Sequence, residues 1–184
     1  MKKSFIAAVV LASASFAAPG VWAQTDISSP PQALDLVDNS AFFGDSFEAG
    51  NSGNTFADRF TFSITDTVGQ NLDAIVASVS RTADVGLDIT GIWLFDGDDT
   101  MLSEGTSMET GAMDVWTVAG NNLGAGDYYL RVNGTIVSDD GASFGGAMML
   151  MPVPEPGAYG MMLGGLGILG FLARRRQAKR EQDG

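Results

Sequence analysis

The sequence predicts an all-β protein whose central part is a small, antiparallel, jelly-roll-like β-sandwich. Apolar and polar residues alternate with a period of two in several short runs, and Gly, Asn, Asp and Ser separate these runs. Residues 24–152 carry no apolar stripe at helical spacing, apart from residues 33–37, where we expect a short helical turn. The 129 residues of this region suit one domain with its own hydrophobic core.

Six alternating runs in this domain are predicted strands. Their bounds are 55–65, 71–81, 85–95, 113–118, 126–137 and 142–151. In a strand, side chains at every second position point to the same face, so the apolar positions of a run define one side of a sheet. The expected apolar faces are Phe56, Phe60, Phe62 and Ile64 in the first run; Ile75, Ala77 and Val79 in the second; Val85, Leu87, Ile89, Trp93 and Phe95 in the third; and Tyr128, Leu130, Val132 and Ile136 in the fifth.

These faces divide the aromatic residues between core and surface. Trp93 and Tyr128 lie on apolar faces, so we expect them to pack in the core. Tyr129 shares the polar face with Arg131 and Asn133. It is therefore a candidate contact residue for a ligand such as a sugar.

One acidic residue interrupts the apolar alternation. Asp58 shares a face with Phe56 and Phe60, and a carboxylate on a core-facing side costs free energy unless it is paired or hydrogen-bonded. The same Phe-x-Asp-x-Phe pattern occurs thirteen residues earlier. The Gly- and Asn-rich stretch between the two copies predicts a hairpin with the two motifs on neighbouring strands. The residues of the earlier copy are Phe43, Asp45 and Phe47.

Three alternatives remain open for Asp58. Its carboxylate accepts backbone N–H bonds at a strand end or bulge, or it pairs with Arg81 or Arg131, or it binds a metal ion together with Asp45. The sequence does not decide between them.

Residues 1–23 have the parts of a secretory signal peptide. Two lysines precede an apolar run over residues 5–16, and Val21-Trp22-Ala23 resembles a cleavage site with small residues at alternate positions. We expect the mature chain to begin at Gln24. The alternative is an uncleaved anchor helix, which the shortness of the apolar run disfavours.

The C-terminal residues 153–184 combine a Pro-Glu-Pro motif, an uncharged apolar run over 157–173 and a basic tail over 174–184. Seventeen helical residues at ~1.5 Å each reach about 25 Å, close to the ~30 Å of a hydrocarbon core. Because positive charge beside a span stays in the cytoplasm, the predicted topology is an outside domain, one transmembrane helix and an inside tail. The defining residues are Val153, Pro154, Glu155, Pro156, Arg174, Arg175 and Arg176.

This order of proline motif, short Gly-rich span and arginine cluster resembles the PEP-CTERM sorting signal of Gram-negative bacteria. The resemblance implies recognition by a membrane enzyme, exosortase, with transient retention in the inner membrane. Processing near the Pro-Glu-Pro motif and release or transfer to the cell surface then follow. Prolines keep the backbone extended, which suits an enzyme that binds the motif just outside the membrane. The alternative is an ordinary membrane anchor.

A second resemblance concerns the domain itself. Phe56, Asp58 and Phe60, followed by "TF", resemble the FxDxF family of PEP-CTERM proteins. Residues 123–136 and the Gly-Gly-containing run over 144–156 also resemble the closing segments of that family, although Asp127 stands where we would expect Thr. The resemblance implies no activity, and it assigns no role to Asp58.

Composition excludes several classes of function. Residues 24–152 contain nineteen acidic and three basic residues, a formal net charge of −16 against −12 for the whole chain. Such a surface repels phosphate backbones, so nucleic-acid binding is excluded. The chain contains no Cys and no His, which excludes thiol nucleophiles, Ser-His-Asp triads and His-ligated metals.

One turn is a candidate calcium site. Asp96, Asp98 and Asp99 lie together in a Gly-containing turn, and calcium prefers six to eight oxygen ligands. Glu104 and Glu109 do not fall where an EF-hand loop requires an acid, so the alternative is an acidic surface turn.

We therefore expect an exported surface or extracellular-matrix protein that is not an enzyme. Its expected partners are an exosortase-type enzyme, the inner membrane during sorting, and exopolysaccharide, because the PEP-CTERM resemblance implies a link to exopolysaccharide or biofilm production. No cofactor is expected beyond the candidate calcium. The alternatives are a small secreted hydrolase acting through carboxylates and a permanently anchored periplasmic protein.

Overall fold

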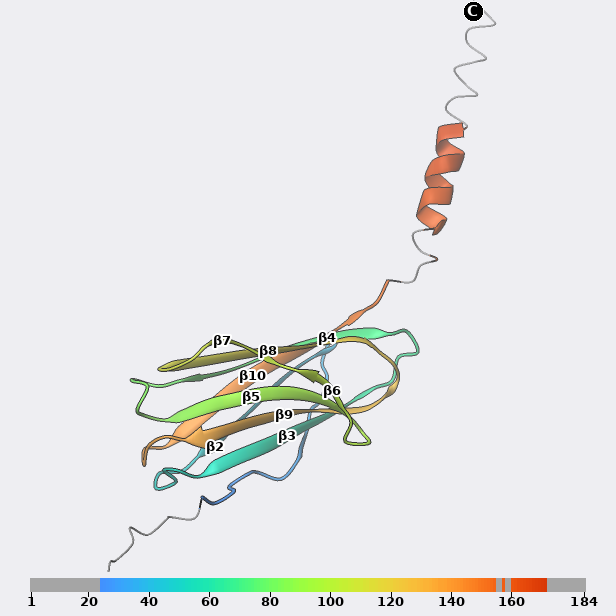
Figure 1. Ribbon diagram of the computed structural model, residues 1–184. Coiled ribbons are helices and arrows are strands. Elements are labelled where there is room, and N and C mark those ends of the chain that lie inside the picture. Colours follow the sequence, from blue (N-terminus) through green and yellow to red (C-terminus); the bar gives the residue numbers. More distant parts are fainter. Residues whose placement is uncertain (1–23, 155–156, 158–159, 172–184) are drawn as a thin grey trace, which may run out of the picture.

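The computed structural model describes residues 24–154, 157 and 160–171 of the 184-residue chain (Figure 1). Ten strands form two five-stranded sheets that pack face to face. The predicted β-sandwich is therefore confirmed, whereas its jelly-roll-like connectivity stays a prediction. The strands are β1 (Gln32–Ala33), β2 (Ser40–Phe47), β3 (Thr55–Ile64), β4 (Gln70–Val79), β5 (Leu87–Asp96), β6 (Met101–Glu104), β7 (Thr106–Glu109), β8 (Met113–Leu123), β9 (Gly126–Ile136) and β10 (Ala142–Pro152).

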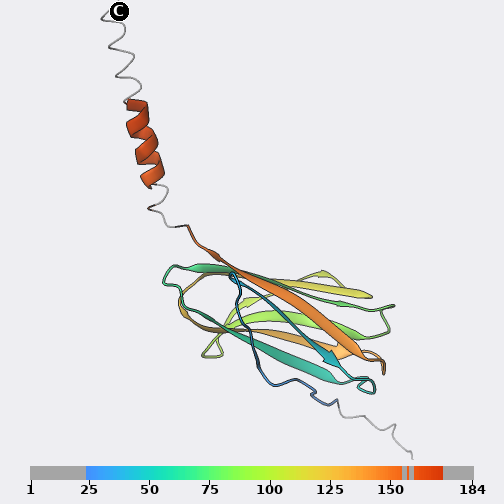
Figure 2. The same cartoon turned by 180° about the vertical axis from the view of Figure 1, so that it is seen from behind.

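The two sheets are antiparallel except at one edge. The first has the order β1-β3-β9-β5-β6 and the second has the order β2-β10-β4-β8-β7. The short β1 pairs with β3 in parallel, with Gln32 opposite Phe60. Figure 2 shows the N-terminal segment (blue) running along the side of the sandwich before the chain enters β2.

The core lies between the sheets and comes from alternate positions of the long strands. On β3 and β9 the inward faces are those predicted, from Phe56 to Ile64 and from Tyr128 to Ile136. Leu130 and Val132 are fully buried, and aromatic rings fill the end of the core near β2. Period-two patterning therefore identifies the core face wherever only one side of a strand is apolar.

The predicted face of β4 is wrong. Leu72, Ala74 and Val76 are buried, whereas Ile75 and Val79 are exposed on the outer side. β4 carries apolar side chains on both of its faces, the buried one and the exposed one. Alternation cannot choose between two apolar faces.

The predicted face of β5 is right in its first half and wrong in its second. Leu87 and Ile89 point inward, but the register against β9 shifts between Ile89 and Gly91. This bulge moves the following residues to the opposite face, so Trp93 and Phe95 lie outside. A Cβ at Gly91 would collide with the Trp93 ring, so glycine at this position lets the ring lie against the strand.

Two further predictions fail. Residues 33–37 form no helical turn, because Ala33 ends β1 and the rest is extended or irregular. The two Phe-x-Asp-x-Phe motifs do not form a hairpin: β2 and β3 belong to different sheets. The loop between them crosses from one sheet to the other, so the motifs face each other through the core. The sequence analysis also missed β6 and β7, which lie at sheet edges and are largely exposed.

The C-terminal tail is described only in part. Residues 160–171 are helical, and their apolar side chains are exposed. Among the described residues, no helix is long and apolar enough to cross a membrane. The predicted span over 157–173 thus remains a prediction. The signal peptide (1–23), Glu155, Pro156 and the arginines at 174–176 lie outside the described residues.

Replacing a core phenylalanine should cost far more stability than replacing an exposed one. We expect Phe60→Ala to lower the free energy of unfolding by about 3–5 kcal/mol, because Phe60 is 2% exposed and contacts aromatic rings of the other sheet. The matched control is Phe42→Ala, since Phe42 is 86% exposed and its loss should change stability by about 0.5 kcal/mol or less. Urea unfolding measures both; equal losses would contradict this packing.

Candidate functional site

The two Phe-x-Asp-x-Phe motifs meet as three facing pairs. The rings of Phe43 and Phe60 have centroids 4.9 Å apart, and those of Phe47 and Phe56 are 4.6 Å apart. β2 and β3 run in opposite directions here, so Asp45 and Asp58 form the central pair. Phe144 of β10 closes the cluster, stacking on Phe56 at 5.3 Å. Two carboxyl groups are thereby enclosed by aromatic rings.

The Asp58 side chain is 2% exposed and only partly satisfied. Its Oδ1 accepts the backbone N–H of Ser29 at 2.8 Å. The first of the three alternatives was backbone N–H bonds at a strand end or bulge. The backbone donor is found, but Asp58 lies in the middle of β3 and the donor comes from the segment beside this strand. The Oδ2 atoms of Asp58 and Asp45 are buried and have no donor in the described structure. When both groups are ionised, each of them therefore has one buried oxygen without a hydrogen-bond donor in the described structure.

Burial raises the pKa of Asp58 to about 6, with further contributions from the charge of Asp45 and from a hydrogen bond between the two side chains. The bond from Ser29 acts in the opposite direction. A proton on Asp58 allows this hydrogen bond between the two carboxyl groups. Near neutral pH this proton is largely lost, and two negative charges then lie close together at a largely buried position.

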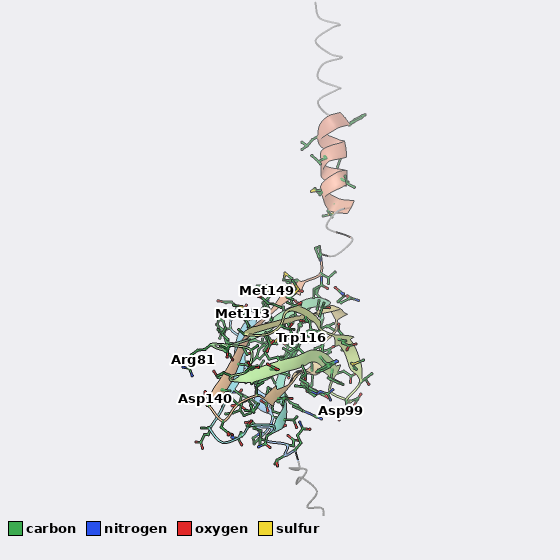
Figure 3. The ribbon with its side chains drawn as sticks, turned by 60° about the vertical axis from the view of Figure 1, so that its left-hand side comes forward. Arg81, Asp99, Met113, Trp116, Asp140 and Met149 are labelled. Carbon is green, nitrogen blue, oxygen red and sulfur yellow. The ribbon has the colours of Figure 1, made fainter. Side chains whose placement is uncertain are left out.

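The second alternative for Asp58, an ion pair with Arg81 or Arg131, is wrong. Arg131 lies on the outer face of β9, with its guanidinium over the rings of Trp93 (5.3 Å) and Phe95 (4.6 Å). Arg81 pairs with Asp140 at 3.6 Å, and the two lie on the opposite side of the domain from Asp99 (Figure 3). Neither arginine reaches the inward-facing carboxylate.

An irregular N-terminal strap, residues 25–33, covers the edge of β3 beside the pair. Backbone pairing joins Ile27 to Thr55 and Leu34 to Thr61. Between these bonds, Pro30 and Pro31 have no N–H to donate, so the regular ladder is interrupted. A cavity of about 350 Å³ opens there, lined by residues 29–32 and 58–60 and by Gly44 and Asp45.

The outer face of the first sheet carries a stack of aromatic and arginine side chains. Register places Arg59, Arg131 and Trp93 side by side across three strands, and Tyr129 beside Phe95 in the next row. The Tyr129 and Phe95 rings stack at 4.9 Å, and Arg59 lies 4.9 Å from the Tyr129 ring. Tyr129 is on the predicted face, but its neighbours cover it.

A polar cleft of about 590 Å³ adjoins this stack. Its walls come from residues 33–36, from β3, from the turn after β5 and from β9. Inside it, the Tyr129 hydroxyl donates to Asp99 at 2.6 Å, and Arg59 contacts the same carboxylate at 3.2 Å. The Ser63 hydroxyl donates to Asp127 at 2.6 Å. The cleft thus brings hydroxyl groups, carboxylates and a guanidinium close to aromatic rings. Such groups suit a hydroxyl-rich ligand.

The candidate calcium turn is organised without a metal. Asp96 Oδ1 accepts the backbone N–H groups of Asp98 (3.0 Å) and Thr100 (2.8 Å), which is how Asp stabilises a turn. Asp99, at a φ of 61°, is occupied by Arg59 and Tyr129. In the described part of the chain no three acidic side chains converge as a metal site. The structure therefore does not bring Asp96, Asp98 and Asp99 together as calcium ligands.

The sequence analysis missed one buried acid. Asp114 of β8 is 2% exposed and accepts three bonds, from Ser78 Oγ (3.2 Å) and from the backbone N–H groups of Ile89 (3.1 Å) and Gly111 (3.1 Å). Its position among apolar residues in the predicted strand at 113–118 was the available signal. Because it is satisfied by fixed donors, we interpret it as a structural group.

The sandwich is followed by a C-terminal segment that contains the helix described over residues 160–171. Residues 152–176 match the model of the PEP-CTERM protein-sorting motif. The chain therefore carries this motif, as its residues indicated. The motif implies processing by exosortase, and with it export and exosortase-mediated sorting to the surface.

Solved structures give only a weak likeness to the domain. The pre-peptidase C-terminal domain of a collagenase from Bacillus anthracis is 16% identical, over 66% of this chain and 95% of that one, with a TM-score of 0.38. PliG, a periplasmic inhibitor of g-type lysozyme from Aeromonas hydrophila, is 11% identical, over 69% of this chain and all of that one, with a TM-score of 0.42. A comparison with curated proteins gives no match.

The carboxyl pair should make stability rise on acidification. Because the pKa of Asp58 is raised from 3.8 to about 6, its protonation favours the folded state below pH 3.8, and this contribution is lost as pH rises to about 6. Without bound cation, we expect Asp58→Asn to be more stable than the unchanged protein at pH 7.5 by about 2–3 kcal/mol, and to lose much of the gain between pH 7.5 and 5.

Urea unfolding at several pH values, in the presence of a chelator, measures this. General relief of charge repulsion also stabilises an acidic protein on acidification, so a charge-matched control is needed. Asp73→Asn removes one charge from an exposed position on β4 and should keep the original pH dependence. If both variants gave the same dependence of stability on pH, the Asp45–Asp58 pair would not be the source of that dependence.

Proposed function

We propose that this chain is an exported surface or extracellular-matrix protein, sorted by an exosortase-type enzyme, with a non-catalytic binding or structural role in an exopolysaccharide matrix. The observation that carries the proposal is the PEP-CTERM motif at residues 152–176, which begins at the last residue of β10. The sorting tail and the domain thus have separate tasks. The first delivers the protein, and the second acts at the destination.

The junction between domain and motif supports release without loss of fold. The last backbone bond of this region runs from Val153 N to Gly69 O at 2.8 Å. Pro154 follows and has no N–H to donate. Among the described residues, cutting the chain after Pro154 would therefore remove no strand and no backbone hydrogen bond of the sandwich, so the processed domain keeps its core.

The polar cleft beside the aromatic–arginine stack supports the binding part of the proposal. Saccharides present many hydroxyls, which carboxylates and tyrosine hydroxyls can bind, and their apolar ring faces pack on aromatic rings. Arg59 and Arg131 are two of only three basic residues between 24 and 152, and both belong to this face. We propose this face as the exopolysaccharide contact.

The alternative of a carboxylate-dependent hydrolase is less well supported. Two carboxyl groups facing each other beside a cavity, Asp45 and Asp58, are the pair that would serve it. Asp58 is only 2% exposed and the strap covers it, so a substrate atom has little access to both groups. We therefore propose that the protein is not an enzyme.

Processing can be tested by intact-mass spectrometry of the protein from membrane and extracellular fractions of an exosortase-containing host. We expect a released form that begins at Gln24 and ends between residues 153 and 156. Glu155→Ala should leave the uncut membrane form, because the motif loses the acid between its prolines. Glu109→Ala is the matched control and should be released normally. A protein found only in membranes with residue 184 intact would be an ordinary anchored protein, the alternative stated above.

Binding can be tested by affinity electrophoresis in gels containing the host exopolysaccharide. We expect Arg59→Gln to weaken retardation several-fold, since Arg59 forms one wall of the cleft. Arg81→Gln makes the same charge change at the far side of the domain and should leave retardation unchanged. Equal effects of the two substitutions, or no retardation of the unchanged protein, would overturn the cleft as the contact.

A further inference from the structure

The Asp45–Asp58 pair contains an unmet bonding requirement that the proposed function does not use. One carboxylate oxygen of each residue is buried and lacks a donor within the described structure. The Asp58 residue is 2% exposed, and Asp45 and Asp58 both line the cavity under the strap. In native proteins a buried polar atom without a partner is rare and calls for an explanation.

Nearby side chains do not supply the missing positive charge. Arg59 follows Asp58 in sequence but points to the opposite face of β3, where it pairs with Asp99 at 3.2 Å. Arg131 is held on the outer face by Trp93 and Phe95. Asp26 of the strap adds negative charge near Asp58. The pair is thus a local concentration of negative charge in a domain whose net charge is already strongly negative.

The cavity has the chemistry of a cation site. Pro30 and Pro31 line it and have no N–H to donate, and the Ser29 N–H is already used by Asp58 Oδ1. Arg59 also lines the cavity, but its guanidinium pairs with Asp99. Its volume of about 350 Å³ leaves room for an ion and several waters. Carboxylate, carbonyl and water oxygens are the ligands that calcium prefers, and a coordination of six to eight accommodates irregular geometry.

We propose that Asp45 and Asp58 hold a calcium ion in the cavity between β2, β3 and the N-terminal strap. The ion neutralises both carboxylates and ties the strap to two strands from opposite sheets. Since only two carboxylates take part and three acidic side chains do not converge anywhere in the described residues, the remaining ligands are main-chain and water oxygens. Such a site belongs with extracellular calcium modules, whose dissociation constants are ~10⁻⁴–10⁻³ M. This inference goes beyond the proposed function and does not depend on exopolysaccharide binding.

Thermal unfolding of the full chain in mild detergent at pH 7.5 tests the site. With about 10 mM calcium chloride we expect the midpoint to rise by about 4–7 °C over sodium chloride of equal ionic strength, which is the shift expected for a sub-millimolar to millimolar site. Asp45→Asn and Asp58→Asn should abolish the rise. Both replacements keep the side-chain shape, and near-UV circular dichroism establishes that each variant is folded.

The control is Asp98→Asn, which removes one charge from the exposed acidic turn after β5 and should leave the calcium-dependent rise intact. Equilibrium dialysis gives a second readout: the unchanged protein and Asp98→Asn should retain one calcium more than Asp58→Asn. If the two carboxyl groups shared a proton and bound no calcium, the midpoint would rise on acidification and calcium would have no effect at pH 7.5. This result would overturn the proposal. So would a rise of equal size in all four proteins, because it would reflect general screening.

Discussion

The facing of the two Phe-x-Asp-x-Phe motifs is the constraint on which this sandwich depends. The chain leaves β2 in one sheet and enters β3 in the other, so the motifs meet in opposite directions, Phe43 on Phe60 and Phe47 on Phe56. This crossing joins the two sheets at one edge and fixes their spacing there with aromatic rings, which contribute large buried areas. The same geometry places two carboxyl groups opposite each other, so packing and electrostatics cannot be separated at this edge.

The domain buries two acids, Asp114 and Asp58, and satisfies them to different degrees. Asp114 accepts three bonds from fixed donors, two of them backbone N–H groups, and so is satisfied by the fold itself. Asp58 accepts one bond, its Oδ2 has no donor in the described structure, and the residue lines a cavity. A buried polar group satisfied by the fold needs nothing more, whereas one left open costs stability until a proton or an ion completes it. The cost falls at the strap, the least regular part of the domain.

Much of this arrangement follows from the sequence, and the failures have physical causes. Period-two patterning predicted the sandwich, the inward faces of β3 and β9, and the unusual inward position of Asp58. It failed at β4, where both faces are apolar, and at Trp93, where a bulge shifted the register by one residue. The Gly- and Asn-rich loop led to the wrong prediction of a hairpin, because a loop sequence does not say whether the chain stays in one sheet or crosses to the other. The aromatic–arginine face could not be predicted either, because it depends on strand order.

Basic residues are concentrated at the two ends of the chain, whereas most acidic residues lie in residues 24–152. Seven of the ten basic residues lie outside residues 24–152, in the parts that direct export and sorting, and the three that remain are committed to ion pairs or aromatic stacks. Release of the domain would therefore leave a strongly acidic protein in which only three side chains of residues 24–152 are basic. Such proteins repel one another and attract divalent cations. A cation held at the crossing between the sheets would then lower the charge at the one place where the fold itself brings two carboxylates together, which is where repulsion acts most directly against folding.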